Sequence, residues 1–304
     1  MENWVGMSLY NSELTNKMQS TEINAPTTTN TIPNKFRIAV CFSGQPRYWK
    51  ECANNIKRFF EFHRPHPETG QPVETDYFIH TWDTNTWRLP KTEHNVFFDE
   101  KHDDGEQIRN EFKPKSLIVE NYVKDRFYLR SFDPLFYSLS RSLLLKRDYE
   151  LQNNFQYDLV IKARLDVIYN PANKFPLQHV WPGICYTASL ISKFPSEFNY
   201  NNFDDVLFYG NSPTMDLIGD LYNMHNVEKP FEDQVVNQVG INLDPIFYYG
   251  PGCLLYKYLT KLGIHPDGSR MFEYAVMRST AIDAKLDAVY QYEEIRRKWF
   301  EWYI

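Results

Sequence analysis

The sequence predicts an α/β protein with a largely parallel sheet, on three observations. Short apolar runs alternate with segments of helical spacing through most of the first 225 residues. The run within 157–170 is nearly continuously apolar before it reaches charged residues, which is typical of a buried strand. A length of 304 residues with 42% hydrophobic side chains is enough for one large core or two smaller ones.

Composition along the chain predicts three regions. Residues 1–34 are polar and rich in Thr, Asn and Pro, which predicts a flexible leader. Residues 35–225 are predicted to form the α/β core, and 226–304 a more helical part of the same globule. Large aromatic side chains recur at helical spacing from residue 280. That helix is predicted to dock on its own domain or to provide a homodimer surface.

The first elements follow from local pattern. A strand is predicted from Phe36, stopping at Ser43 and Gly44, and apolar residues then recur at helical spacing over 49–60. A Pro-rich segment ends that helix, and 76–83 predicts a second strand. Residues 84–110 carry many charges without a clear period, which predicts an irregular or weakly helical insertion.

The later elements alternate in the same way. Residues 115–121 predict a strand, and the pair Asp133 and Pro134 predicts the start of a helix that leads to the strand at 158. Further strands are predicted at 183–188 and 204–210, and helices at 213–224 and 254–264.

Charge and hydropathy exclude several classes of function. The net charge of -6 gives no overall basic field, which makes duplex nucleic acid a poor candidate partner. No segment approaches the roughly 18 uninterrupted apolar residues of a membrane-spanning helix, and the N-terminus lacks a secretory signal pattern. Four dispersed cysteines form no CxxC pair, which favours reduced packing residues. These features predict a cytoplasmic protein.

Two short segments carry the first chemical signals. The loop Ser43, Gly44 to Arg47 follows a strand and enters a helix, so that backbone N–H groups and Arg47 are suited to a phosphate. Arg164 and Asp166 follow the strand within 157–170. In an open α/β sheet, ligands bind beyond the carboxyl ends of the strands. The alternative is that these charges only mark where strands reach solvent.

The ordered set of segments resembles a known enzyme family. SGQPR, HTWD, YSLSRSLLLKRDYE before YDLVIKARLDV, DDVLFYGNSPTM and LLYKYLTKLGI together resemble nucleotide-sugar glycosyltransferases of the GT-A fold, over residues 36–278. Within that family, the chain most resembles the members encoded in bacterial and viral surface-polysaccharide loci. It implies transfer of a sugar from a UDP- or GDP-sugar to a hydroxyl of a glycan or other acceptor, in polysaccharide biosynthesis, in the cytoplasm or, for a viral member, in the host cytoplasm.

The resemblance also implies a diphosphate and metal centre. Family members hold Mn2+ or Mg2+ with a DxD motif, whose positions match Arg164, Leu165 and Asp166 here, so Arg replaces the first Asp. Either Asp166 binds the metal with Arg164 on phosphate, or Arg164 neutralises the charge and metal is dispensable. His265 is a further candidate metal ligand, and Arg278, with Arg270, a candidate contact to the departing diphosphate.

The remaining candidates complete the donor and acceptor sites that the resemblance implies. Trp82 is a candidate for base stacking and Asp83 for ribose or base contacts, although a buried Trp beside a surface Asp is the plainer interpretation. Lys146 and Arg141, both on the predicted helix 135–151, are candidates to reach the nucleotide-sugar pocket. The alternative is that they belong to a solvated face, as charges on a helix commonly do.

The resemblance also implies an acidic residue that acts as a base on the acceptor hydroxyl or orients the donor sugar. Asp205 is the first candidate and Asp204 the second, with Asp233 beside Glu232 as the rival pair.

Two other functions fit the same sequence. A sugar-phosphate nucleotidyltransferase shares the broad fold, but SGQPR lacks the lysine of the Gly-rich loop that such enzymes carry. A non-catalytic carbohydrate-binding protein is the non-enzymatic alternative.

Overall fold

The computed structural model describes most of the chain from Lys35 to residue 276. The described residues are 35–61, 65–88, 97–122, 133–170, 175, 177, 180–187, 192–193, 201–223, 251–268 and 274–276. The predicted leader and the predicted helix from residue 280 lie outside them. Within these ranges, none of the helices combines the length and the apolar character needed to cross a membrane.

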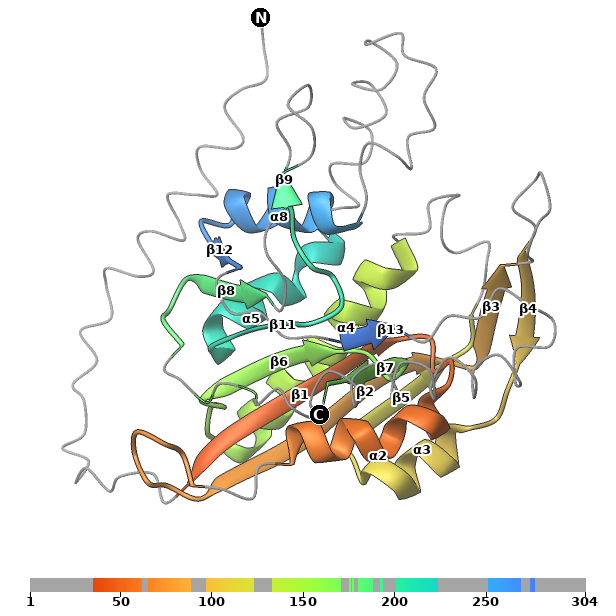
Figure 1. Ribbon diagram of the computed structural model, residues 1–304, viewed down its shortest axis with the longest axis horizontal. Helices are drawn as coiled ribbons and strands as arrows, with labels where there is room; N and C mark the ends of the chain where they lie inside the picture. The colour runs from red at the N-terminus through yellow and green to blue at the C-terminus, as the bar shows by residue number, and fades with distance from the viewer. Residues whose placement is uncertain are drawn as a thin grey trace, which may run out of the picture. The chain divides into compact units, whose positions relative to one another are not determined.

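The described strands include a seven-stranded sheet (Figure 1). β11 runs antiparallel to both of its neighbours, and every other pairing in the sheet is parallel. The predicted α/β fold with a largely parallel sheet is therefore confirmed. From one edge to the other the strands are β12 (His265–Asp267), β8 (Ile184–Thr187), β11 (Phe208–Gly210), β6 (Leu159–Ala163), β1 (Phe36–Gly44), β2 (Val73–Trp82) and β5 (Ser116–Glu120).

Strand β1 shows why the apolar runs are almost continuous. Successive side chains of a strand point to opposite faces, and both faces of this sheet are buried. Val40 and Phe42 lie in one core cluster, whereas Ala39 and Cys41 lie in another. From Ile38 to Phe42 both faces are filled by apolar side chains, so the alternation of a half-exposed strand is absent.

Helices cover both faces of the sheet. The first core cluster holds buried residues of α2 (Trp49–Phe60) and α3 (Gly105–Phe112), and the second holds those of α4 (Asp133–Asn153), α5 (Ser212–Gly219) and α8 (Pro251–Lys261). Figure 1 shows α2 and α3 together on one side of the sheet, with α5 and α8 on the other. The predicted spacing over 49–60 is confirmed, because every apolar residue that defined it is buried.

The region 84–110 differs from its prediction as an irregular or weakly helical insertion. The structure forms an antiparallel pair from β3 (Thr84–Arg88) and β4 (Phe97–Lys101), followed by α3. Pairing between two separated segments supplies the hydrogen bonds, so neither strand needs a strong local signal. Helix α3 contributes only Ile108 and Phe112 to the core, which is too short a pattern to stand out.

Two short pairings complete the described strands. β7 (Val167–Tyr169) pairs with β13 (Tyr274–Val276), and β9 (Ser192–Lys193) pairs with β10 (Asn201–Asn202). Residues 164–166 connect β6 to β7, so the chain turns directly after the central strand. The predicted strand over 204–210 is confirmed only for its last three residues, which form β11.

Asp204 and Asp205 precede β11 instead of opening it. The carboxylate of Asp204 accepts a hydrogen bond of 2.8 Å from the backbone N–H of Val206. Such a local bond gives the backbone an alternative to the sheet ladder, which accounts for the later start of the strand.

Candidate functional site

The candidate site lies where the order of the sheet reverses. β1 has β2 on one side and β6 on the other, and all three strands are parallel. The crevice beyond the carboxyl ends of the strands at such a reversal is the usual ligand site of open α/β sheets. Two segments leave the sheet here, the loop after Gly44 and the turn 164–166.

These two segments bring together three of the predicted residues. Asp166 accepts two hydrogen bonds from Arg164, of 2.7 Å from Nε to Oδ1 and 2.6 Å from a terminal nitrogen to Oδ2. Arg47, from the other segment, lies 3.4 Å from the same Oδ2. Burial alone would lower the pKa of Arg164, but the adjacent carboxylate of Asp166 raises it overall. Both guanidinium groups therefore converge on one buried carboxylate.

A buried lysine ties a third segment to this centre. Nζ of Lys162, on β6, donates to the backbone carbonyls of Asp205 and Val206, the latter at 3.2 Å. Burial lowers the pKa of Lys162 to about 8, although Asp205 opposes this shift. Asp205 also raises the pKa of Arg164, so it belongs to the same electrostatic cluster. Strand β6 therefore holds the segment 204–206 beside the arginines.

The two neighbouring acids of this segment differ in accessibility. Asp204 is buried, and its carboxylate already accepts the bond from Val206 N. Asp205 is partly exposed. A catalytic carboxylate must reach its substrate, so Asp205 is the better placed of the two. The rival pair Glu232 and Asp233 lies outside the described residues, as do Arg270 and Arg278.

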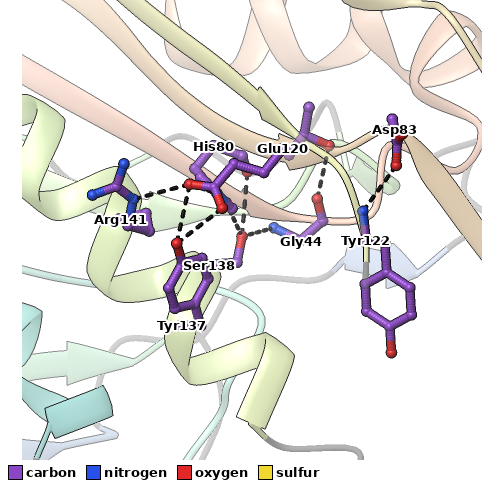
Figure 2. Close-up of polar contacts among 9 residues, drawn as sticks. Gly44, His80, Asp83, Glu120, Tyr122, Tyr137, Ser138 and Arg141 are labelled. Atoms are coloured by element: carbon purple, nitrogen blue, oxygen red, sulfur yellow. Dashed lines mark hydrogen bonds and ion pairs between the residues drawn. The ribbon is translucent and has the colours of Figure 1, made fainter. Parts of the chain in front are cut away.

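The loop after β1 is held at Gly44 by two hydrogen bonds. The N–H of Gly44 donates to Oγ of Ser138 at 2.7 Å, and Oγ1 of Thr81 donates to the carbonyl oxygen of Gly44 at 2.8 Å. Figure 2 shows Gly44 against Ser138, which projects from α4. Gly44 has a φ of 114°, a conformation that residues with a Cβ rarely adopt. Ser43, the preceding candidate, is buried at the end of β1.

Ser138 belongs to a polar network that sequence reasoning missed. Its Oγ lies 2.8 Å from Nδ1 of His80, and Nε2 of His80 lies 3.5 Å from Oε1 of Glu120 (Figure 2). Tyr137 and Arg141 also donate to Glu120, at 2.9 Å and 3.2 Å. Ser138 and His80 are completely buried, so this serine does not face a substrate. The network instead supports the loop that carries Arg47.

A signal for this network existed in the sequence. His80 interrupts an apolar strand pattern, and Ser138 occupies a core position between apolar residues of a helix. Buried polar side chains need partners, so two of them in predicted core positions indicate a network. Only the packing of α4 on β2 shows that the two residues pair with each other.

The side chains of Trp82 and Asp83 are both engaged in contacts within the protein. Trp82 is 1% exposed, and it stacks on Tyr137 with ring centroids 5.6 Å apart. Asp83 accepts a hydrogen bond from the N–H of Tyr122 at 2.9 Å (Figure 2). It accepts a second from Oγ1 of Thr84 at 2.8 Å. The partly exposed rings that pack on this aromatic cluster are those of Tyr122 and Tyr222.

Lys146 lies in a separate buried cluster. Its Nζ donates to Glu150 at 2.8 Å, to Asp216 at 2.7 Å and to Ser212 at 2.6 Å. These partners lie on α4 and α5, and Lys146 is completely buried among them. The lysine therefore links two helices, and the structure does not bring it to the arginines.

His265 does not join Asp166 at one site. It begins β12 opposite Ile184, the first residue of β8, at the amino end of these parallel strands, whereas Asp166 follows the carboxyl end of β6. Three strand spacings of about 4.8 Å also separate β12 from β6, roughly 14 Å in all. The two side chains are too far apart to bind the same metal ion, so the expectation of a shared ion is corrected.

The described donor set does not fit a divalent cation. Mn2+ and Mg2+ require several oxygen ligands. Both oxygens of Asp166 accept from Arg164, and its side chain is 0% exposed. Among the described residues, no group of three or more His, Cys, Asp or Glu side chains is arranged to hold a metal ion.

Comparison with known proteins gives no family assignment. No protein-family model matches the chain, and no curated protein matches it significantly. A fold alone does not define a function, so any functional conclusion depends on the chemistry of the site.

We predict that Ser138→Ala destabilises the protein by about 1–3 kcal/mol, because the buried His80 and the partly buried N–H of Gly44 lose their partner. Ser142→Ala is the matched control on the same helix. Its Oγ is equally buried but donates only within the helix, to the carbonyl of Leu139. Urea unfolding of both variants measures the difference. Equal losses for the two would contradict the role assigned to Ser138.

We predict that the contribution of Lys162 to the free energy of unfolding becomes more favourable as the pH rises. Its pKa is about 8 in the folded protein against 10.5 for an ordinary lysine. Between these values the unfolded chain binds more protons, so stability rises with pH. The free energy of unfolding of wild type relative to Lys162→Met should increase across this window by on the order of 3 kcal/mol.

Urea unfolding from pH 7 to 10.5 measures this effect, with Lys57→Met as the control for removal of a lysine. A difference between wild type and Lys162→Met that stays constant with pH would show that Lys162 is not shifted.

Proposed function

We propose that the protein is a glycosyltransferase that moves a sugar from a nucleotide-diphosphate donor, a UDP- or GDP-sugar, to a hydroxyl of a glycan or other acceptor. One observation carries this proposal: Arg47 and Arg164 converge on Asp166 beyond the carboxyl ends of β1 and β6. The leaving group of this reaction is a nucleoside diphosphate. Guanidinium groups match phosphate oxygens in geometry and charge, and arginine does not lose its charge at working pH.

The proposed reaction exchanges one carbon–oxygen bond for another. The acceptor oxygen forms a bond to the anomeric carbon, while the bond from that carbon to the β-phosphate oxygen breaks. The electron pair of the broken bond stays on the diphosphate, where the arginine side chains stabilise the developing charge. The proton of the acceptor hydroxyl passes to a carboxylate. The products are the glycosylated acceptor, the nucleoside diphosphate and one proton.

Asp205 is the proposed carboxylate. It is partly exposed, it interacts electrostatically with Arg164, and Lys162 holds its backbone in place. A base must lie within hydrogen-bond reach of the proton that it accepts. In the proposed complex the anomeric carbon is bonded to the β-phosphate, so a carboxylate beside the proposed diphosphate site supports the assignment of Asp205 as the base.

The nucleoside is proposed to extend from the arginines toward β2 and β5. This direction follows the carboxyl ends of the strands, where the partly exposed rings of Tyr122 and Tyr222 pack beside Trp82 and Tyr137. Base stacking on an aromatic ring requires an accessible face, which favours these tyrosines over the buried Trp82. Cytoplasmic location and a homodimer through the C-terminal helix remain predictions.

We predict that Asp205→Asn lowers the rate of sugar transfer by about 100-fold or more, because an amide cannot accept the proton. Binding of the nucleoside diphosphate should be retained. A thermal-shift panel of UDP-, GDP- and CMP-sugars first identifies the donor, since a ligand that binds the folded state raises the unfolding temperature. Transfer is then measured as release of the nucleoside diphosphate.

Asp148→Asn, at an exposed position of α4, is the matched control and should transfer at the wild-type rate. Pyrophosphate release from a nucleoside triphosphate and a sugar phosphate would instead identify a nucleotidyltransferase. Glycan binding without any nucleotide-sugar binding would identify a carbohydrate-binding protein.

A further inference from the structure

We propose that Arg47 and Arg164 neutralise the donor diphosphate in place of a divalent cation, and that Asp166 is a positioning residue for these arginines. This inference rests on the proposed function, and it concerns how the same site holds its donor. The contacts of Asp166 support it. Asp166 is the candidate metal ligand of the turn 164–166, and its carboxylate is already bonded to guanidinium groups.

The contacts of Asp166 leave little for a metal ion to bind. Each of its oxygens accepts a hydrogen bond from Arg164, and Oδ2 also lies 3.4 Å from a nitrogen of Arg47. The side chain is 0% exposed. A cation at this carboxylate would displace strong charge-assisted hydrogen bonds and then lie beside two fixed positive charges.

The other acids of the cluster do not supply an alternative site. Asp204 is buried and its Oδ1 is bonded to the backbone N–H of Val206. Within the ranges that the structure describes, these acids do not belong to any group of three or more His, Cys, Asp or Glu side chains arranged to hold a metal ion. His265 lies at the opposite end of the strands, as described above.

Arg164 retains donors for a phosphate after it has bound Asp166. A guanidinium group carries five N–H donors, and the two bonds to Asp166 use two of them. The pairing fixes the plane of the group at the end of β6. Arg47 enters from the other strand and its side chain is 21% exposed. Two guanidinium groups held at one carboxylate form a preorganised site for a dianionic group, and they cost no reorganisation when it binds.

The charged side chains of the cluster balance, with Arg47, Arg164 and Lys162 beside Asp166, Asp205 and Asp204. Asp166 and Asp205 both interact electrostatically with Arg164 and with the buried Lys162. Asp166 is paired with two arginines. An incoming diphosphate binds the remaining donors and competes with this carboxylate for the positive charge of the arginines, so Asp166 sets the geometry of the arginines and moderates their affinity.

Isothermal titration of wild type with UDP and GDP, in EDTA and in Mn2+, tests the inference without any mutation. Binding should be equal in the two conditions. Arg47→Met should weaken binding in EDTA by about tenfold or more, the loss expected when a charged hydrogen bond to phosphate is removed. Arg109→Met, at an arginine of α3 that is 52% exposed, is the matched control and should bind as wild type does.

The variant Asp166→Asn tests whether Asp166 positions the arginines or binds a metal ion. The asparagine has nearly the same shape but does not compete for the arginines with a negative charge. Binding of the nucleotide in EDTA should therefore be at least as tight as in wild type, while the transfer rate falls because the arginines are no longer held. Circular dichroism and thermal unfolding confirm that the variant is folded.

The outcomes distinguish this inference from the proposed function. Nucleotide binding that EDTA abolishes and Mn2+ restores would overturn the inference and leave the glycosyltransferase proposal standing. Loss of nucleotide binding in Asp166→Asn, with the wild-type fold retained, would do the same. Absence of UDP and GDP binding in both conditions would overturn the proposed function together with the inference.

Discussion

The parallel pairing of β1 with β6 is the constraint on which the candidate site depends. Ile38 to Phe42 pair in register with Leu159 to Ala163, so both strands end at the same edge of the sheet. Apart from the buried Lys162 of β6, the paired residues of both strands are apolar, and none of them is exposed to a ligand. The charged residues of the site are therefore confined to the segments that follow, and the register brings Arg47 to the carboxylate that Arg164 also binds.

Buried polar contacts then fix those segments in place. Gly44 is held through its N–H and its carbonyl group, and Lys162 bonds to two carbonyl oxygens of the segment before β11. A buried polar group without a partner is costly, so each of these contacts penalises any movement of its segment. The segments that carry the charged residues of the site are therefore held in place by hydrogen bonds from the sheet and from α4.

The sequence predicted the fold and part of the site for definite physical reasons. Continuous apolar runs required strands covered on both faces, and Arg47, Arg164 and Asp166 were identifiable because they directly follow such runs. Lys146 was misplaced because helical spacing does not show which neighbour a helix meets, and here it meets α5. His265 was misplaced because its edge of the sheet depends on strand direction.

By itself, the sequence determined the α/β class, the main strands and helices, and the charged residues at the strand ends. Local pattern is sufficient for these, because burial and chain direction act on each segment separately. Only the tertiary structure decided that Asp166 pairs with two arginines, that Ser138 and His80 support Gly44, and that β3 and β4 pair antiparallel. These features depend on contacts between segments distant in the chain, and no local pattern encodes which distant group becomes the partner.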